Sequence, residues 1–282
     1  MDRRPFGPTG VSVVRIGLGT WQMEGDDRKS CIEALHAGLD AGMTHVDTAE
    51  LYGSGRVEEL IVADAIEGRR DALFLVSKVM PSHATKRGTI AACEKSLKRL
   101  RTDRLDCYLL HWPGSHALED TIDGFEALRE AGKIRAWGVS NFDEEELAHA
   151  LDIAGPGKIA CNQVLYHLAE RAIEHAVLPF CEQHGIAVVG YTPFGTSAFP
   201  PGGSAGNQTL KSIADKHGAS VRQVALAFLT RRPSLFGIPK SAQAAHTRDN
   251  AGAGSLALDA ADEAAIDAAF PLGRRRRGVP TL

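Results

Sequence analysis

Four side chains able to take part in acid–base chemistry occur at the ends of apolar segments or just beyond them. Asp47, Lys78 and His111 each end such a segment or directly follow it, and Tyr52 lies just beyond Asp47. Each has an ordinary structural explanation when considered alone: a helix cap, a surface lysine, a loop histidine with satisfied hydrogen bonds, or a ring packed at a rim. Their shared position after apolar segments favours a common site.

These four residue types are suited to acting together on a carbonyl group. A lysine that emerges at the end of a strand needs a counter-charge, and Asp47 can supply one to Lys78. We expect the ammonium to favour the phenolate and to lower the pKa of Tyr52 from an ordinary value of about 10, so that Tyr52 delivers a proton near neutral pH. His111 can orient the carbonyl oxygen by a hydrogen bond while a hydride reaches the carbon.

The elements that must position these residues follow a regular alternation. Short apolar segments alternate with amphipathic ones from residue 15 to about residue 250, which is typical of a parallel sheet with crossover helices. Eight such units predict an α/β fold, a single (β/α)8 TIM barrel, in which reacting groups lie where strands end. The expected strands are residues 15–18, 45–47, 73–78, 105–110, 134–139, 159–162, 186–189 and 235–237.

The remaining segments fit around this barrel. Residues 5–7 and 11–13 predict an N-terminal β-hairpin that could close the barrel floor, and residues 259–270 predict a C-terminal helical extension. The Gly- and Pro-rich residues 195–207 are expected to form a long loop after the seventh strand. Because no linker divides the chain, we expect residues 1–282 to form one domain.

Composition excludes several classes of function. The 282 residues are 44% hydrophobic and 24% charged, with a formal net charge of -3, which indicates a soluble globular protein without an obvious polyanionic partner. The five cysteines form no C-x-x-C pair and fit a reducing compartment. No apolar stretch is long enough for a signal peptide or a membrane span. We expect a cytoplasmic monomer that binds neither nucleic acid nor membrane, with residues 274–277 as a solvated basic tail.

A hydride requires a cofactor, and the sequence offers one phosphate-binding segment. Residues 17–22 contain only the first two glycines of the Rossmann fingerprint and are better explained as a tight turn at the barrel mouth. After the eighth strand, Lys240 precedes an expected short helix, and barrels commonly bind phosphate at such a helix N-terminus. An ordinary helix entry remains the alternative.

Three motifs resemble those of the aldo-keto reductase family, and the similarity covers essentially the entire chain. Residues 47–53, Asp-Thr-Ala-Glu-Leu-Tyr-Gly, resemble the family's D-T-A-x-x-Y-G signature. Val76-Ser77-Lys78 resembles its lysine strand, and Leu110-His111-Trp112-Pro113 resembles its histidine motif. The combination is highly specific.

The resemblance implies roles for the four residues introduced above. Asp47, Tyr52, Lys78 and His111 would form the catalytic tetrad, with tyrosine as the general acid, lysine and aspartate tuning it, and histidine orienting the carbonyl. Tyr52, His111, Trp21 and Trp112 are expected to line the substrate pocket, although simple packing at the rim explains the two tryptophans equally well. The segment after residue 113 and the tail 271–282 are short compared with pocket-closing loops of many family members, which leaves the identity of the carbonyl substrate open.

The resemblance also implies a binding site for a nicotinamide cofactor. Ser140, Asn141 and Gln163 would hydrogen-bond the carboxamide, and Tyr191 would stack on the nicotinamide ring. Considered alone, Ser140 and Asn141 are better explained as a turn that enters a helix. The full set of expected contacts is Gly19, Thr20, Trp21, Asp47, Ser140, Asn141, Gln163, Tyr191, Thr192, Phe194, Lys240, Ser241, His246, Asp249 and Asn250.

The expected cofactor is NADPH, with NADH as a weaker alternative. Lys240 and Ser241 lie where the family binds the adenosine 2′-phosphate. Members strict for NADPH usually have an arginine at the position of His246, which lacks the permanent charge and planar fork of a guanidinium. Arg248 is close enough in sequence to substitute. We therefore expect weaker discrimination against NADH than an arginine would provide.

Two other functions deserve comparison with a carbonyl reductase. Some barrels of this family bind the cofactor as regulatory subunits with little turnover, because a fold does not guarantee an activity. A metal-dependent hydrolase using His45 and Asp47 would need further ligands, which the strand ends do not supply. We therefore expect an enzyme without a metal.

Overall fold

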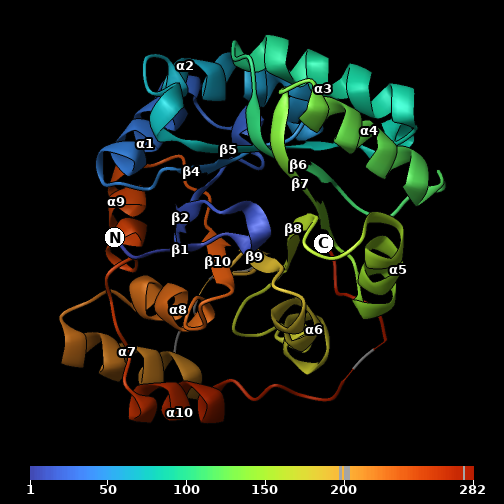
Figure 1. The fold of residues 1–282 in the computed structure, drawn as a ribbon. Coiled ribbons are helices and arrows are strands. Elements are labelled where there is room, and N and C mark those ends of the chain that lie inside the picture. The colour runs from blue at the N-terminus through green and yellow to red at the C-terminus, as the bar shows by residue number, and fades with distance from the viewer. Residues whose placement is uncertain (197–198, 200–203, 276) are drawn as a thin grey trace.

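Eight parallel strands form the centre of the molecule and neighbour one another in chain order (Figure 1). The computed structural model describes residues 1–196, 199, 204–275 and 277–282. Parallel bridges from Ile16 to Gly237 and from Gly19 to Lys240 join the first strand to the last, so the predicted (β/α)8 barrel is confirmed. The strands are β3 (Leu18–Gly19), β4 (His45–Asp47), β5 (Phe74–Val79), β6 (Leu105–Leu110), β7 (Ile134–Ser140), β8 (Ile159–Leu165), β9 (Ala187–Tyr191) and β10 (Leu235–Ile238).

Helices surround this barrel and bury their apolar faces against it (Figure 1). Local signals explain where several begin: Asp143 caps α5 and accepts from the backbone N–H of Glu146, whose carboxylate accepts from the N–H of Asp143 at 2.9 Å, as the capping-box pattern predicts. The helices are α1 (Arg28–Asp40), α2 (Ala63–Ile66), α3 (Lys86–Leu100), α4 (Leu118–Glu130), α5 (Glu144–Ala154), α6 (Val177–Gln183), α7 (Ala205–His217), α8 (Val221–Leu229), α9 (Ala244–Gly252) and α10 (Ala260–Ala269).

The expected loop 195–207 ends earlier than its composition indicates. Ser204 caps α7 by accepting a hydrogen bond from the backbone N–H of Asn207 at 3.1 Å, so residues 205–207 are helical. Residues 197–198 and 200–203 lie outside the described part of the chain. Glycines and small polar residues favour a loop by composition, but a serine cap reverses that preference at the end of the segment.

The N-terminal hairpin closes the end of the barrel where the strands begin. Strands β1 (Arg3–Pro5) and β2 (Ser12–Val14) pair antiparallel, as predicted. Phe6 between them is fully buried, and its ring centroid lies 4.7 Å from that of Phe74 and 5.0 Å from that of Phe236, at the starts of β5 and β10. Because this floor is filled by side chains, a ligand must enter from the opposite end, where Asp47, Lys78 and His111 lie.

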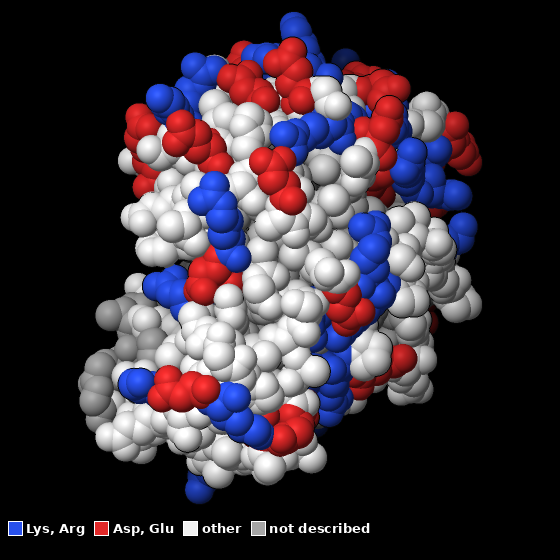
Figure 2. Space-filling model, turned by 90° about the vertical axis from the view of Figure 1, so that its left-hand side faces the viewer, with Lys and Arg blue, Asp and Glu red and all other residues white. Residues whose placement is uncertain are grey.

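The surface over α1 and α9 carries charges of both signs. Figure 2 shows lysine and arginine side chains interspersed with aspartate and glutamate on this face. Within the described residues, no helix is both long and apolar enough to cross a membrane. All five cysteines are buried free thiols.

Candidate active site

Lys78 is the centre of a buried cluster at the carboxyl ends of β4 and β5. Its ammonium donates to Asp47 Oδ1 at 2.6 Å, to the Thr48 carbonyl at 2.9 Å and to the Tyr52 hydroxyl at 3.1 Å. The side chains of Lys78 and Asp47 are 0% and 1% exposed. Burial is the largest single effect and lowers the pKa of Lys78, but Asp47 and Tyr52 together outweigh it, so the pKa lies above its ordinary value and the ammonium stays charged.

The pKa of Tyr52 differs from the expectation. Burial raises it above its ordinary value, and the nearby Lys78 ammonium only partly opposes that rise. The prediction that this pKa lies below its ordinary value is therefore wrong, although Lys78 acts in the expected direction. Desolvation of the buried phenolate is the largest effect and Asp47 adds to the rise, so together they outweigh the attraction of the ammonium. The phenol consequently keeps its proton through the neutral range, as a proton donor must.

His111 lies beside the phenol as a neutral imidazole. Burial, with a contribution from Lys78, lowers its pKa to about 2, so the ring is uncharged at any ordinary pH. Its centroid lies 5.8 Å from that of Tyr52, edge to face, and 4.8 Å from that of Trp112. Its Nδ1 has no hydrogen-bond partner among the described residues. A neutral imidazole retains one N–H and one lone pair, which suits it to hydrogen-bond an uncharged oxygen.

Gln163 and Ser140 extend the cluster across the barrel. The Gln163 amide donates to Asp47 Oδ2 at 2.7 Å, so both oxygens of that carboxylate are hydrogen-bonded. The Ser140 hydroxyl donates to the backbone carbonyl of Gln163 at 2.8 Å. The expected cofactor residue Gln163 therefore also fixes the counter-charge of Lys78.

Asn141 connects the same cluster to β9. Its amide nitrogen donates to the His111 carbonyl at 3.2 Å, and its side-chain oxygen accepts from the Tyr191 hydroxyl at 2.9 Å. Both Asn141 and Thr192 have positive φ angles, 61° and 52°, at the ends of β7 and β9. Residues other than glycine rarely adopt this backbone conformation. Where they do, surrounding contacts hold the backbone in place, and such residues cluster at functional sites.

The expected residues after the first strand lie at the same mouth. The buried Thr20 hydroxyl donates to the Asp47 carbonyl at 2.9 Å. Gly19 is required because a Cβ there would lie 2.5 Å from the Ile238 carbonyl oxygen, across the barrel seam. Trp21 and Trp112 are 36% and 37% exposed, which leaves an aromatic surface beside the cluster.

Lys240 and Ser241 lie at the seam where the barrel closes, away from the Lys78 cluster. Lys240 follows β10, and its ammonium forms an ion pair with Asp26, which no pattern in the sequence indicated. The Ser241 hydroxyl accepts from the backbone N–H of Gln243 at 3.0 Å. Gln243 precedes α9 without a side-chain capping bond, which leaves first-turn N–H groups of that helix for a ligand or water.

The expected residues further along α9 face in different directions. His246 is exposed, whereas Asp249 accepts from Ser220 at 2.7 Å and so connects α9 to α8. Asn250 is buried, and its side-chain oxygen has no partner among the described residues. Phe194 packs on Phe199, with ring centroids 5.4 Å apart.

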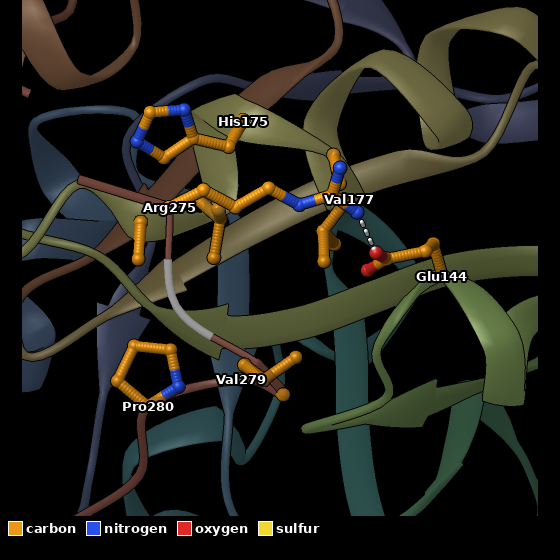
Figure 3. Close-up of a pocket in the computed structure, with 10 residues that line it drawn as sticks. Glu144, His175, Val177, Arg275, Val279 and Pro280 are labelled. Carbon is orange, nitrogen blue, oxygen red and sulfur yellow. Dashed lines mark hydrogen bonds and ion pairs between the residues drawn. The ribbon is translucent and has the colours of Figure 1, made fainter.

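The C-terminal segment reaches the barrel mouth although it is short. Figure 3 shows Arg275 paired with Glu144 of α5, with Val279 and Pro280 in the same hollow beside α6. From there the chain ends over the barrel (Figure 1), with the backbone of Leu282 close to the Tyr191 hydroxyl. The short tail therefore contacts an expected cofactor residue.

Glu58 is a buried residue that sequence reasoning missed. It lies on the π-helical turn η4 (Glu58–Val62), soon after Tyr52, and accepts from Ser77 Oγ at 2.6 Å and from Arg99 Nε at 2.7 Å. Because Ser77 precedes Lys78, this carboxylate fastens the Tyr52 loop to β5. One of two adjacent glutamates in an amphipathic segment gives no signal of such a role, since its partners come from other segments.

We expect Glu58→Gln to lower kcat while leaving cofactor affinity nearly unchanged. The amide cannot match the charge-assisted bonds to Arg99 and Ser77, which we estimate to cost about 1–3 kcal/mol of stability. Steady-state kinetics and thermal unfolding measure the two effects. Glu59→Gln is the matched control because Glu59 is an exposed neighbour on the same turn. Unchanged kcat in Glu58→Gln would show that this residue does not position Tyr52.

His45 lies at the barrel floor, away from the mouth. It is fully buried 5.8 Å from Phe6 and 5.6 Å from Phe74, and burial lowers its pKa to about 4. Among the described residues, no group of three histidine, cysteine or acidic side chains is arranged to bind a metal ion. These positions offer no support for a hydrolase built on His45 and Asp47.

Comparison with known proteins identifies relatives over nearly the full chain. The aldo/keto reductase family model matches residues 15–270. Methylglyoxal reductase YeaE from Escherichia coli is 43% identical over 93% of this chain and 92% of that protein. Glyoxal reductase from Bacillus subtilis is 34% identical over 92% of this chain and 90% of that protein.

Solved structures give the same result. A crystal structure of an aldo/keto reductase from Klebsiella pneumoniae in complex with NADP and acetate superposes with a TM-score of 0.92, at 41% identity and with all of both chains covered. A thermostable aldo-keto reductase, Tm1743, superposes with a TM-score of 0.88 at 36% identity, over 97% of this chain and 100% of that one. The solved structures share this barrel, and the family match runs from the first barrel strand to the last helix. This chain therefore belongs to the aldo/keto reductase family.

Proposed function

We propose that this protein reduces an aldehyde or ketone to the alcohol with NADPH, using Tyr52 as the general acid. The observation that carries this proposal is the buried contact of Lys78 with both Asp47 and the Tyr52 hydroxyl. The relatives named for methylglyoxal and glyoxal reduction favour small dicarbonyl substrates. The half-exposed Trp21 and Trp112 beside the cluster suit an uncharged substrate better than a highly charged one.

Three features of the chain fit a nicotinamide dinucleotide. The buried Asn250 oxygen lacks a partner among the described residues, and the first turn of α9 has no side-chain cap. Tyr191 is only partly buried and lies at the mouth beside Asn141. We assign Tyr191, Asn141, Ser140 and Gln163 to the nicotinamide end. The residues assigned to the adenosine end are Lys240, Ser241, His246, Asp249 and Asn250.

The side chains of the cluster then have separate tasks. Bound NADPH supplies the hydride that the carbonyl carbon accepts. The neutral His111 imidazole donates a hydrogen bond that orients the carbonyl oxygen, and Tyr52 transfers its phenolic proton to that oxygen. Lys78 stabilises the phenolate that remains, and a proton from solvent restores the phenol. Asp47 keeps the ammonium in place and charged.

A cofactor-binding regulatory barrel with little turnover is the alternative. One experiment distinguishes the two functions. Purified protein is titrated with NADPH while binding is monitored by fluorescence, and methylglyoxal or glyoxal is then added. Oxidation of NADPH with formation of the alcohol supports the proposed enzyme. Binding without oxidation across a panel of aldehydes and ketones supports the regulatory function instead.

The dependence of the rate on pH tests the protonation state assigned to Tyr52. Because burial raises its pKa, the active phenol form is present below that pKa and is lost as pH rises through it. We expect kcat for carbonyl reduction to stay flat through neutral pH and to fall only in the alkaline range. His111, with its pKa at about 2, should add no acidic limb. A decline of kcat centred near neutral pH would contradict the Tyr52 assignment if it occurs as pH rises, and the His111 assignment if it occurs as pH falls.

A further inference from the structure

Asp26 forms an ion pair with Lys240, the residue whose ammonium the proposed function assigns to a phosphate. The ion pair joins the loop before α1 to the segment after β10, two parts of the chain that meet where the barrel closes. The closure itself fixes this geometry, because the backbone N–H of Gly19 donates to the Pro239 carbonyl at 3.1 Å, beside Lys240.

The pair is placed where a ligand can reach it. The side chains of Lys240 and Asp26 are 30% and 36% exposed. A pair this exposed contributes little to the stability of a fold, so its rearrangement costs little. The uncapped first turn of α9 lies just beyond, after Gln243. An anion arriving at this turn would meet Lys240, and it would also meet the carboxylate of Asp26.

We propose that Asp26 sets the coenzyme preference by competing with the 2′-phosphate of NADPH for Lys240. The phosphate must displace or tolerate a carboxylate of its own sign, which lowers NADPH affinity. NADH has a ribose hydroxyl in place of the phosphate, and a carboxylate can accept its hydrogen bond. Asp26 therefore penalises NADPH relative to NADH.

This role deepens the proposed function and depends on Lys240 as the phosphate ligand. The neighbouring Asp27 provides a comparison within the same loop. Asp27 accepts from the backbone N–H and the hydroxyl of Ser30, both at 2.8 Å, and thereby caps α1. The Asp27 carboxylate is thus engaged in capping α1, whereas the Asp26 carboxylate pairs with Lys240.

The test is a binding titration of the full-length protein with NADP+ and with NAD+, in which tryptophan fluorescence reports binding. We expect Asp26→Asn to strengthen NADP+ binding by about threefold to tenfold and to leave NAD+ binding equal or weaker. Asp27→Asn removes the same charge one residue away and keeps a good helix cap, so it should change the NADP+ to NAD+ ratio by less than about twofold. An unchanged ratio in Asp26→Asn would overturn the role of Asp26.

Lys240→Met separates this inference from the proposed function. If Lys240 binds the phosphate, this variant should weaken NADP+ by about tenfold and NAD+ little, and Asp26→Asn should have little further effect in the Lys240→Met background. If Lys240→Met affects both cofactors equally, the phosphate site itself is misassigned. If Lys240→Met is selective for NADP+ but Asp26→Asn is silent, only the competition by Asp26 fails.

Discussion

Replacing Tyr52 by phenylalanine is expected to lower kcat/KM for carbonyl reduction by about 10² to 10⁴ while leaving NADPH affinity nearly intact. The substitution removes the hydroxyl that Lys78 contacts at 3.1 Å and with it the proposed proton donor. The ring remains to pack beside His111. Steady-state kinetics with methylglyoxal, together with an NADPH titration, measure the two quantities separately.

Tyr108→Phe is the matched control for this substitution. Tyr108 is fully buried on β6, and its hydroxyl has no hydrogen-bond partner among the described residues. Losing that hydroxyl should leave both activity and stability close to wild type, because no bond is broken. The role of Tyr52 would be refuted if Tyr52→Phe kept more than half of the wild-type kcat/KM.

Replacing Lys78 by methionine is expected to have effects on both catalysis and stability. Activity should fall by about 10² or more, because the phenolate formed after proton transfer loses its counter-charge. The Asp47 carboxylate would keep its bond from Gln163 but would be left buried without a cation, which costs about 3–5 kcal/mol. Kinetics and denaturant unfolding of the same preparation measure the two effects.

Two comparisons make the Lys78 result interpretable. Lys86→Met removes an exposed lysine that pairs with Asp123 at 3.1 Å, so it should change neither property by much. The double variant Lys78→Met with Asp47→Asn removes the unpaired charge and should recover much of the lost stability without recovering activity. Recovery of activity in the double variant would contradict the proposed role of the ammonium.

The barrel could be predicted because its signals are local. Alternation of apolar and amphipathic segments marked the strands, and the expected strand 105–110 agrees with β6 residue for residue. The hydrogen bonds between Asp143 and Glu146 at the start of α5 likewise join residues three apart, a spacing that a sequence shows directly. Residues at the ends of successive strands were expected to lie together at one end of the barrel, because all strands of a (β/α)8 barrel end at the same face.

What could not be predicted depends on contacts between distant segments. Asp47 and Gln163 are joined only when β4 and β8 share a barrel, and Asp26 meets Lys240 only at its seam. The pKa of Tyr52 was misjudged because it depends on a balance between burial and two opposite charges, and a sequence shows the charges without the burial. The start of α7 was missed because one serine cap lay within a glycine-rich stretch.

Transfer of deuterium tests the proposed hydride transfer most directly. The wild-type protein would be incubated with methylglyoxal and NADPH deuterated at both positions of nicotinamide C4, and the product analysed by mass spectrometry and NMR. We predict a single deuterium on the former carbonyl carbon for each NADP+ formed, with this product nearly absent from the Tyr52→Phe variant over the same time. Bound NADPH that stays unoxidised, or an alcohol that carries only solvent hydrogen, would contradict carbonyl reduction by this protein.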